Sequence, residues 1–269
     1  MNIDNFLFAF GLTVFAGLAT SIGSLIGLYT SKTNTKFLSV ALGFSAGVMI
    51  YVSFVEIFQK ARTSLIADLG VVAGNWYTVI AFFGGMLIIA LIDKCVNKLN
   101  NPHEIHKVEE LADLKDATNN KLYKTGILTA LAIAIHNFPE GLATFASAMQ
   151  DPSLGIAIAF AIAVHNIPEG IAVSVPIYYA TGSKLKAFFY SSISGVAEPI
   201  GALVGYLLFA KYFTDTVFGI LFAGVAGVMV FISLDQLLPV AREYGEHHLA
   251  IYGLFAGMVV MALSLLLFL

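Results

Sequence analysis

Two nearly identical hexapeptides carry side chains of the types that bind metal ions. One reads HNFPEG from His136, and the other reads HNIPEG from His165. In each, histidine and glutamate are four residues apart, a spacing that puts both on one face of a helix. The asparagine lies about 100° further round the helix, where it reaches a neighbouring position. The candidate ligands are His136, Asn137, Glu140, His165, Asn166 and Glu169.

Each hexapeptide also holds a proline, which removes a backbone N–H and leaves a carbonyl one turn earlier unpaired. In lipid, such a backbone is tolerated only where protein or a water-filled cavity receives it. The chain turns near 150–153, and both motifs lie about 11–17 residues from this turn. A helix rises about 1.5 Å per residue, so both motifs lie at a similar depth. We therefore expect both motifs near the bilayer midplane, on antiparallel neighbouring helices.

A third acidic residue, Glu198, precedes a proline near the middle of the next apolar run. No lysine or arginine lies in the middle of any run. Each mid-membrane carboxylate costs roughly 2.5–3.5 kcal/mol, so these acids must be protonated or must share a cation. The nitrogen and oxygen ligands suit Zn²⁺, Fe²⁺, Mn²⁺, Co²⁺ or Cd²⁺ and disfavour Cu⁺. The single cysteine, Cys95, excludes a site with several thiolates, and we expect no prosthetic group.

The elements that must position these residues are membrane helices. The chain is 58% hydrophobic and only 12% charged, where soluble domains are about a quarter charged. Its apolar runs lack the two-residue alternation of a barrel strand, which favours an all-α polytopic bundle in one transmembrane transport domain. The eight predicted spans are about 5–30, 36–59, 76–98, 124–149, 153–180, 184–210, 213–236 and 249–269.

Lysine and arginine predict the orientation of this bundle. Eleven lie in the connections after spans one, three, five and seven, and three lie on the opposite side. The side with more lysine and arginine is expected to be cytoplasmic. The protein is then expected in the cell membrane with both termini on the side away from the cytoplasm. The polar segment 99–123 then forms a cytoplasmic loop, most simply a solvated charged linker. No basic block suggests nucleic acid as a partner.

Three further residues are candidates for a path to and from the motifs. Ser53 and Glu56 stand near the outer end of the second span, where they could guide cations inward. Asp235 stands near the cytoplasmic end of the seventh span and could mark an exit. An interfacial residue without any such role is an equally good interpretation of each acid.

Together, the paired motifs, Ser53–Glu56, Glu198-Pro199 and Ser233–Asp235 make the chain resemble the ZIP zinc/iron-permease family, in its ZupT-like bacterial branch. The resemblance implies a two-metal site, a homodimer and import into the cytoplasm. The first metal would be bound by His136, Glu140, His165 and Glu169. The second would be bound by Asn137, Asn166 and Glu198, with Glu140 and Glu169 bridging.

The function expected from these residues is uptake of divalent transition metals, with zinc foremost and with no catalytic residue. The main rival function is that of a membrane metalloenzyme, but the His-Glu-x-x-His motif of zinc proteases is absent and the order Glu-x-x-His of di-iron bundles is reversed. The sequence also leaves open a metal exporter, a passive channel and a purely structural membrane protein.

Overall fold

The computed structural model describes residues 3–29, 35–97, 119–209, 214–244 and 247–267, and every element within them is helical. This confirms the all-α fold. Seven of the described helices are long and apolar enough to cross a membrane. The eighth long helix, α6 (Asn119–Gln150), carries the first motif and several buried hydroxyls, so it is less apolar than the others. Of the predicted loop 99–123, residues 99–118 lie outside the described residues, and residues 119–123 belong to α6, which begins earlier than the predicted span.

Four helices form one bundle, which contains both motifs. They are α1 (Ile3–Tyr29), α6, α7 (Pro152–Thr181) and α8 (Lys184–Phe209), and each packs against the other three. Tight turns join the last three. Asp151 caps α7 by accepting the N–H groups of Ser153 and Leu154, and Pro152 opens the helix.

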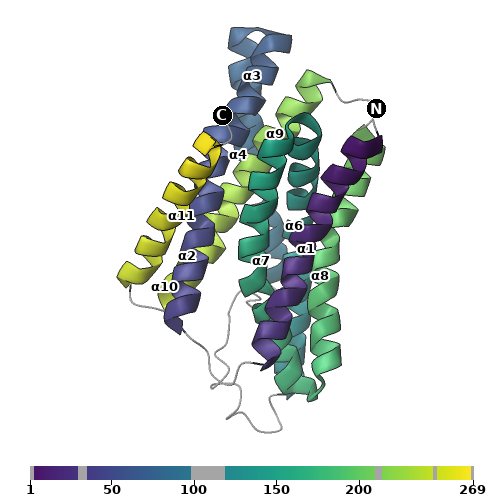
Figure 1. The fold of residues 1–269 in the computed structure, drawn as a ribbon, viewed down its shortest axis with the longest axis vertical. Coiled ribbons are helices and arrows are strands. Elements are labelled where there is room, and N and C mark those ends of the chain that lie inside the picture. Colours follow the sequence, from purple (N-terminus) through teal and green to yellow (C-terminus); the bar gives the residue numbers. More distant parts are fainter. Residues whose placement is uncertain (1–2, 30–34, 98–118, 210–213, 245–246, 268–269) are drawn as a thin grey trace.

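The remaining helices form a second bundle beside the first (Figure 1). Two of its helices are interrupted by π-helical turns, η1 and η2, and continue beyond them. Gly70 ends the first of these long helices with φ of 80°, a conformation that favours glycine. The elements are α2 (Thr35–Val52), η1 (Ser53–Ile57), α3 (Phe58–Leu69), α4 (Val71–Asn97), α9 (Asp215–Ile232), η2 (Ser233–Leu237), α10 (Leu238–Tyr244) and α11 (His247–Leu267).

The two bundles meet mainly where α2 packs against α7, through a shared core of small and branched apolar side chains. Both ends of the chain lie at the end of the molecule that carries α3, as expected for an even number of crossings (Figure 1). The helices also run past two of the predicted span ends, since the turns after Val52 and Ile232 widen the helix without stopping it.

The second bundle contains an internal repeat. The sequence AGVM, three further residues and a serine occur at Ala46–Ser53 and again at Ala226–Ser233. Both copies end at the first residue of a π-helical turn, and both turns are followed by an alanine–arginine pair, at Ala61 and at Ala241. The equivalent sequences therefore adopt the equivalent, uncommon helix geometry.

Candidate metal centre

Helices α6, α7 and α8 bury five of the predicted ligands at the middle of the first bundle. Asn137, Glu140, Asn166 and Glu198 are fully buried, and Glu169 is 7% exposed. The two motif prolines and Pro199, which follows Glu198, lie within continuous helices, as the sequence predicts. Burial of three carboxylates and two amides on three neighbouring helices is costly unless each polar group is satisfied, so these residues are functional candidates on energetic grounds alone.

The two asparagines are held by equivalent hydrogen bonds. Asn137 donates its side-chain N–H to the carbonyl oxygen of Ser194 on α8, at 3.3 Å. Asn166 donates to the carbonyl oxygen of Ala16 on α1, at 2.9 Å, and also to Oε1 of Glu198. Each amide is thus oriented by backbone of a neighbouring helix, which leaves its oxygen directed elsewhere. The Oδ1 atoms of both asparagines are buried and have no hydrogen bond within the described part of the chain.

The glycine that ends the first motif lets α6 approach α8 closely. A Cβ atom on Gly141 would lie 2.6 Å from Cα of Glu198, nearer than any ordinary carbon contact. On the opposite side of the same crossing, a Cβ atom on Gly201 would lie 2.9 Å from the carbonyl carbon of Phe138. The motif glycine therefore positions the backbone that carries Glu198.

The second motif meets α1 in the same way. A Cβ atom on Gly170 would lie 2.9 Å from the carbonyl carbon of Thr20, and one on Gly23 would lie 2.7 Å from that of Ile167. In both hexapeptides, the third residue and the glycine therefore contact the neighbouring helix, which is α8 for the first motif and α1 for the second. This explains why glycine ends both motifs, which the spacing of the ligands alone does not require.

The histidine side chains of the two motifs, His136 and His165, lie outside the side chains that the structure describes, although their backbone is helical. Among the described side chains, no three of the types His, Cys, Asp and Glu come together at one point. In this arrangement Glu198 is directed to the Asn166 amide. That the six motif ligands and Glu198 bind metal ions together therefore stays a prediction.

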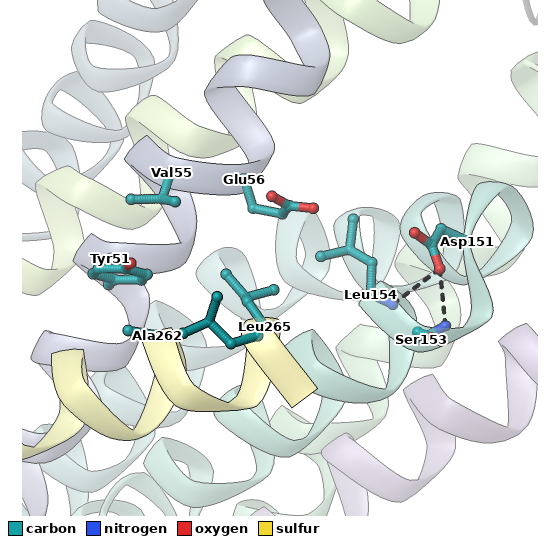
Figure 2. A pocket seen from close by; sticks show the side chains of 9 residues that line it. Tyr51, Val55, Glu56, Asp151, Ser153, Leu154, Ala262 and Leu265 are labelled. Atoms are coloured by element: carbon teal, nitrogen blue, oxygen red, sulfur yellow. Dashed lines mark hydrogen bonds between the residues drawn. The ribbon is translucent and has the colours of Figure 1, made fainter. Parts of the chain in front are cut away.

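At the α3 end of the molecule, Glu56 lies in η1 and lines a cavity of about 310 Å³ between α2, α7 and α11. Figure 2 shows Glu56 and Asp151 on either side of Leu154 at this cavity. Lys60, one turn after Glu56, joins the two acids: its Nζ atom is 3.4 Å from Oε1 of Glu56 and 3.1 Å from Oδ2 of Asp151. The second contact connects α3 of one bundle to the N-terminus of α7 in the other.

This bridge also determines the ionisation of Asp151. Partial burial on its own would raise the pKa of this carboxyl group. The hydrogen bond and the charge of Lys60, with the backbone N–H groups of Leu154 and Ser153, outweigh that effect and hold the pKa of Asp151 below its ordinary value.

At the opposite end, Asp235 lies in η2 and is exposed. Its neighbour Gln236 is nearly buried and donates to Oδ1 of Asp93 on α4, at 3.5 Å. Ser53, at the start of η1, is fully buried and its hydroxyl has no hydrogen bond to a described residue. The predicted path residues therefore lie on both π-helical turns.

Sequence reasoning missed the acids and the base that accompany these path residues, Lys60, Asp93 and Asp151. The AGVM repeat was a usable signal for the turns, because a repeated sequence marks two equivalent structures. No comparable signal pairs Lys60 with Asp151, since 91 positions separate them in the chain.

The family model described as ZIP Zinc transporter matches residues 13–265, nearly the whole chain. The chain belongs to the ZIP zinc transporter family. With this membership and the apolar helices, it is a multi-pass membrane protein.

Curated relatives with the name "Zinc transporter ZupT" support the same assignment. The chain is 65% identical to the relative from Nitratidesulfovibrio vulgaris, with 98% of each chain covered. It is also 65% identical to the relative from Lysinibacillus sphaericus, again with 98% of each covered. The relative from Clostridium perfringens is 63% identical, over 99% of this chain and 98% of its own. The bacterial branch predicted from the paired motifs is thus confirmed.

Proposed function

We propose that this protein carries zinc into the cytoplasm through a two-metal site at the middle of α6, α7 and α8. Zinc is then the transported substrate and no prosthetic group takes part. The relatives named zinc transporters support the substrate, and the resemblance of the motifs supports the ligand set. In this proposal His136, Glu140, His165 and Glu169 bind one ion. Asn137, Asn166 and Glu198 bind a second, with Glu140 and Glu169 bridging.

The observation that carries the proposal is the burial of Glu140, Glu169 and Glu198 on the same three helices as two oriented amides. A divalent cation would neutralise these carboxylates without a lysine or arginine. Amide and carboxylate oxygens with imidazole nitrogen suit zinc, and they also suit Fe²⁺, Mn²⁺, Co²⁺ and Cd²⁺. We therefore propose zinc as the main substrate and these ions as competitors.

The proposed path begins at Glu56, on the side out of the cytoplasm, and ends past Asp235. In this orientation both termini are outside and the 99–123 loop is cytoplasmic. A divalent cation that moves inward gains roughly 4–5 kcal/mol per 100 mV of inside-negative potential, so uptake needs no nucleotide. Ser53 would lie on the path as a neutral oxygen ligand.

The same resemblance supports a homodimer in the cell membrane. Membership of a transporter family favours transport over the metalloenzyme that the sequence left open. Transport needs a sealed compartment, whereas catalysis would form product in detergent, so the two are separable by experiment. Counterflow in vesicles of known orientation separates a carrier from a channel and an importer from an exporter.

The deciding experiment is zinc uptake into sealed proteoliposomes by the wild type and by His136→Ala/Glu169→Ala. Fe²⁺, Mn²⁺, Co²⁺ and Cd²⁺ serve as competitors. The matched control is Asp4→Asn/His248→Ala, which changes the same number of acidic and histidine side chains at exposed positions. We expect saturable uptake in the wild type and the control, and its loss in the motif variant. No uptake by correctly inserted wild type would refute the proposal.

A further inference from the structure

Helices α1 and α8 share a heptapeptide pattern that assigns Thr20 a place in the metal centre. Residues Gly17–Gly23 read GLATSIG, and residues Gly195–Gly201 read GVAEPIG. Four of the seven positions are identical, and the central position is Thr20 in α1 and Glu198 in α8. The two helices run antiparallel, so the pattern relates one side of the bundle to the other (Figure 1).

The contacts of the two heptapeptides follow the same correspondence. Glu198 is the residue that Gly141 of the first motif packs against, and Thr20 is the one that Gly170 of the second motif packs against. The hydrogen bonds agree as well. Asn166 donates to Ala16, and Asn137 donates to Ser194, two residues that each precede the first glycine of a heptapeptide. The pair of α6 with α8 is therefore equivalent to the pair of α7 with α1.

The equivalence fails at one position. Asn166 also bonds the Glu198 carboxylate, and the counterpart of that bond would join Asn137 to Thr20. Threonine is shorter, and no such bond forms. Thr20 Oγ1 and Asn137 Oδ1 are both buried and both lack a hydrogen bond within the described residues. Burial of two polar atoms without a hydrogen-bond partner costs free energy unless a ligand satisfies them.

A second contact places the Thr20 hydroxyl against α8, next to the residue that accepts the Asn137 N–H group. A Cβ atom on Gly195 would lie 3.0 Å from Thr20 Oγ1, so this hydroxyl lies against α8 at that glycine. The residue before Gly195 is Ser194, whose carbonyl oxygen accepts the Asn137 N–H group. The two side chains thus meet α8 at adjacent residues.

We propose that Thr20 Oγ1 and Asn137 Oδ1 form a neutral half-site for a divalent cation, the counterpart of the charged half-site of Asn166 and Glu198. The inference rests on the proposed zinc transport and adds a ligand from α1, a helix outside both motifs. Two neutral oxygens hold a cation, directly or through its water, less tightly than a half-site with a carboxylate. The centre is therefore unequal on its two sides.

The test measures Zn²⁺ affinity of the purified protein in detergent by calorimetry, with Mn²⁺ as a second probe. Thr20→Val removes the hydroxyl at nearly constant volume, and we expect the Zn²⁺ Kd to rise on the order of tenfold. Thr20→Asp adds a carboxylate to the half-site, and we expect the Kd to fall by a similar factor. A defect in folding cannot produce that gain.

Thr13→Val is the matched control, because Thr13 is also buried on α1 but its hydroxyl donates to the Phe10 carbonyl oxygen. This variant should leave the Kd unchanged. If Thr20→Val does not fold, Thr20→Ala against Thr20→Ser repeats the comparison, since both fit the space of threonine. The half-site is refuted if Thr20→Val matches Thr13→Val and Thr20→Asp brings no gain, or if the wild type binds no Zn²⁺.

Uptake into proteoliposomes, measured in parallel, keeps the two proposals apart. Zinc uptake with unchanged affinity in the Thr20 variants would refute the half-site and leave transport intact. Zinc binding that depends on Thr20, in a wild type that carries no zinc across the bilayer, would refute transport and leave the half-site intact.

Discussion

Substitution of Gly141 by alanine tests whether the close contact between α6 and α8 positions the metal centre. Carbon atoms in contact are about 3.5–4.0 Å apart, and the new Cβ atom would lie 2.6 Å from Cα of Glu198. The two helices must therefore separate by roughly 1 Å. An extra methyl group in a packed core costs about 1–3 kcal/mol. The better helix propensity of alanine returns about 0.5–1 kcal/mol, so the net loss of stability is about 0–2.5 kcal/mol.

The separation also moves Glu198 relative to Asn166, and we expect the Zn²⁺ Kd to rise by about 10–100-fold, as for other changes that displace a ligand. The assay combines thermal unfolding in detergent with calorimetry. Gly84→Ala and Gly11→Ala are the controls, because a Cβ atom at either position meets nothing within 4 Å. Both should keep the Kd and keep or raise the Tm. If Gly141→Ala behaves like these controls, the glycine contact does not position the site.

Three further predictions concern charged residues. Lys60→Met and Asp151→Asn should change the KM of zinc uptake in the same direction, by up to about fivefold for an ion pair worth up to about 1 kcal/mol. If the two variants changed the KM in opposite directions, only the net charge at the cavity would matter. The Arg62→Met control measures that charge effect separately. Since the pKa of Asp151 is lowered, its carboxylate stays ionised between pH 8 and pH 5, and the bridge is lost only as pH falls through that lowered pKa. The ratio of uptake by wild type to uptake by Asp151→Asn should thus be constant from pH 8 to pH 5, and a drift would contradict the assignment. Glu198→Gln should raise the Tm, because a neutral amide is cheaper to bury, while it weakens Zn²⁺ binding in calorimetry; a lower Tm would contradict this.

The candidate site was predictable to the extent that it depends on local helix geometry. Histidine and glutamate four apart share a face in any helix, and two copies on adjacent helices meet wherever the connecting turn lies midway between them. Glu198 was expected at a similar depth because it lies near the middle of its apolar run. The five described ligands are each buried, and their union in one metal site stays a prediction.

The remainder depends on contacts between distant segments, which no spacing along the chain specifies. Thr20 stands in a helix without acid or histidine near it, so the short heptapeptide it shares with Glu198 gains a meaning only from its packing against Gly170. The bridge from Lys60 to Asp151 likewise exists only because the two bundles lie side by side. The π-helical turns are an intermediate case, because their sequence is repeated but their geometry is not evident from it.

The two heptapeptides of α1 and α8 bear on how fast an ion is carried from each side of the membrane. An uncoupled carrier moves its ion down the electrochemical gradient whatever the symmetry of its centre, so unequal half-sites do not set the net direction. The proposed half-sites would make capture and release differ in rate, because one half-site holds a carboxylate where the other holds a hydroxyl. The two π-helical turns differ as well, because the position that Glu56 occupies in η1 is occupied by Gln236 in η2. A few side chains, rather than the course of the backbone, would thus give influx and efflux different half-saturation concentrations in one molecule.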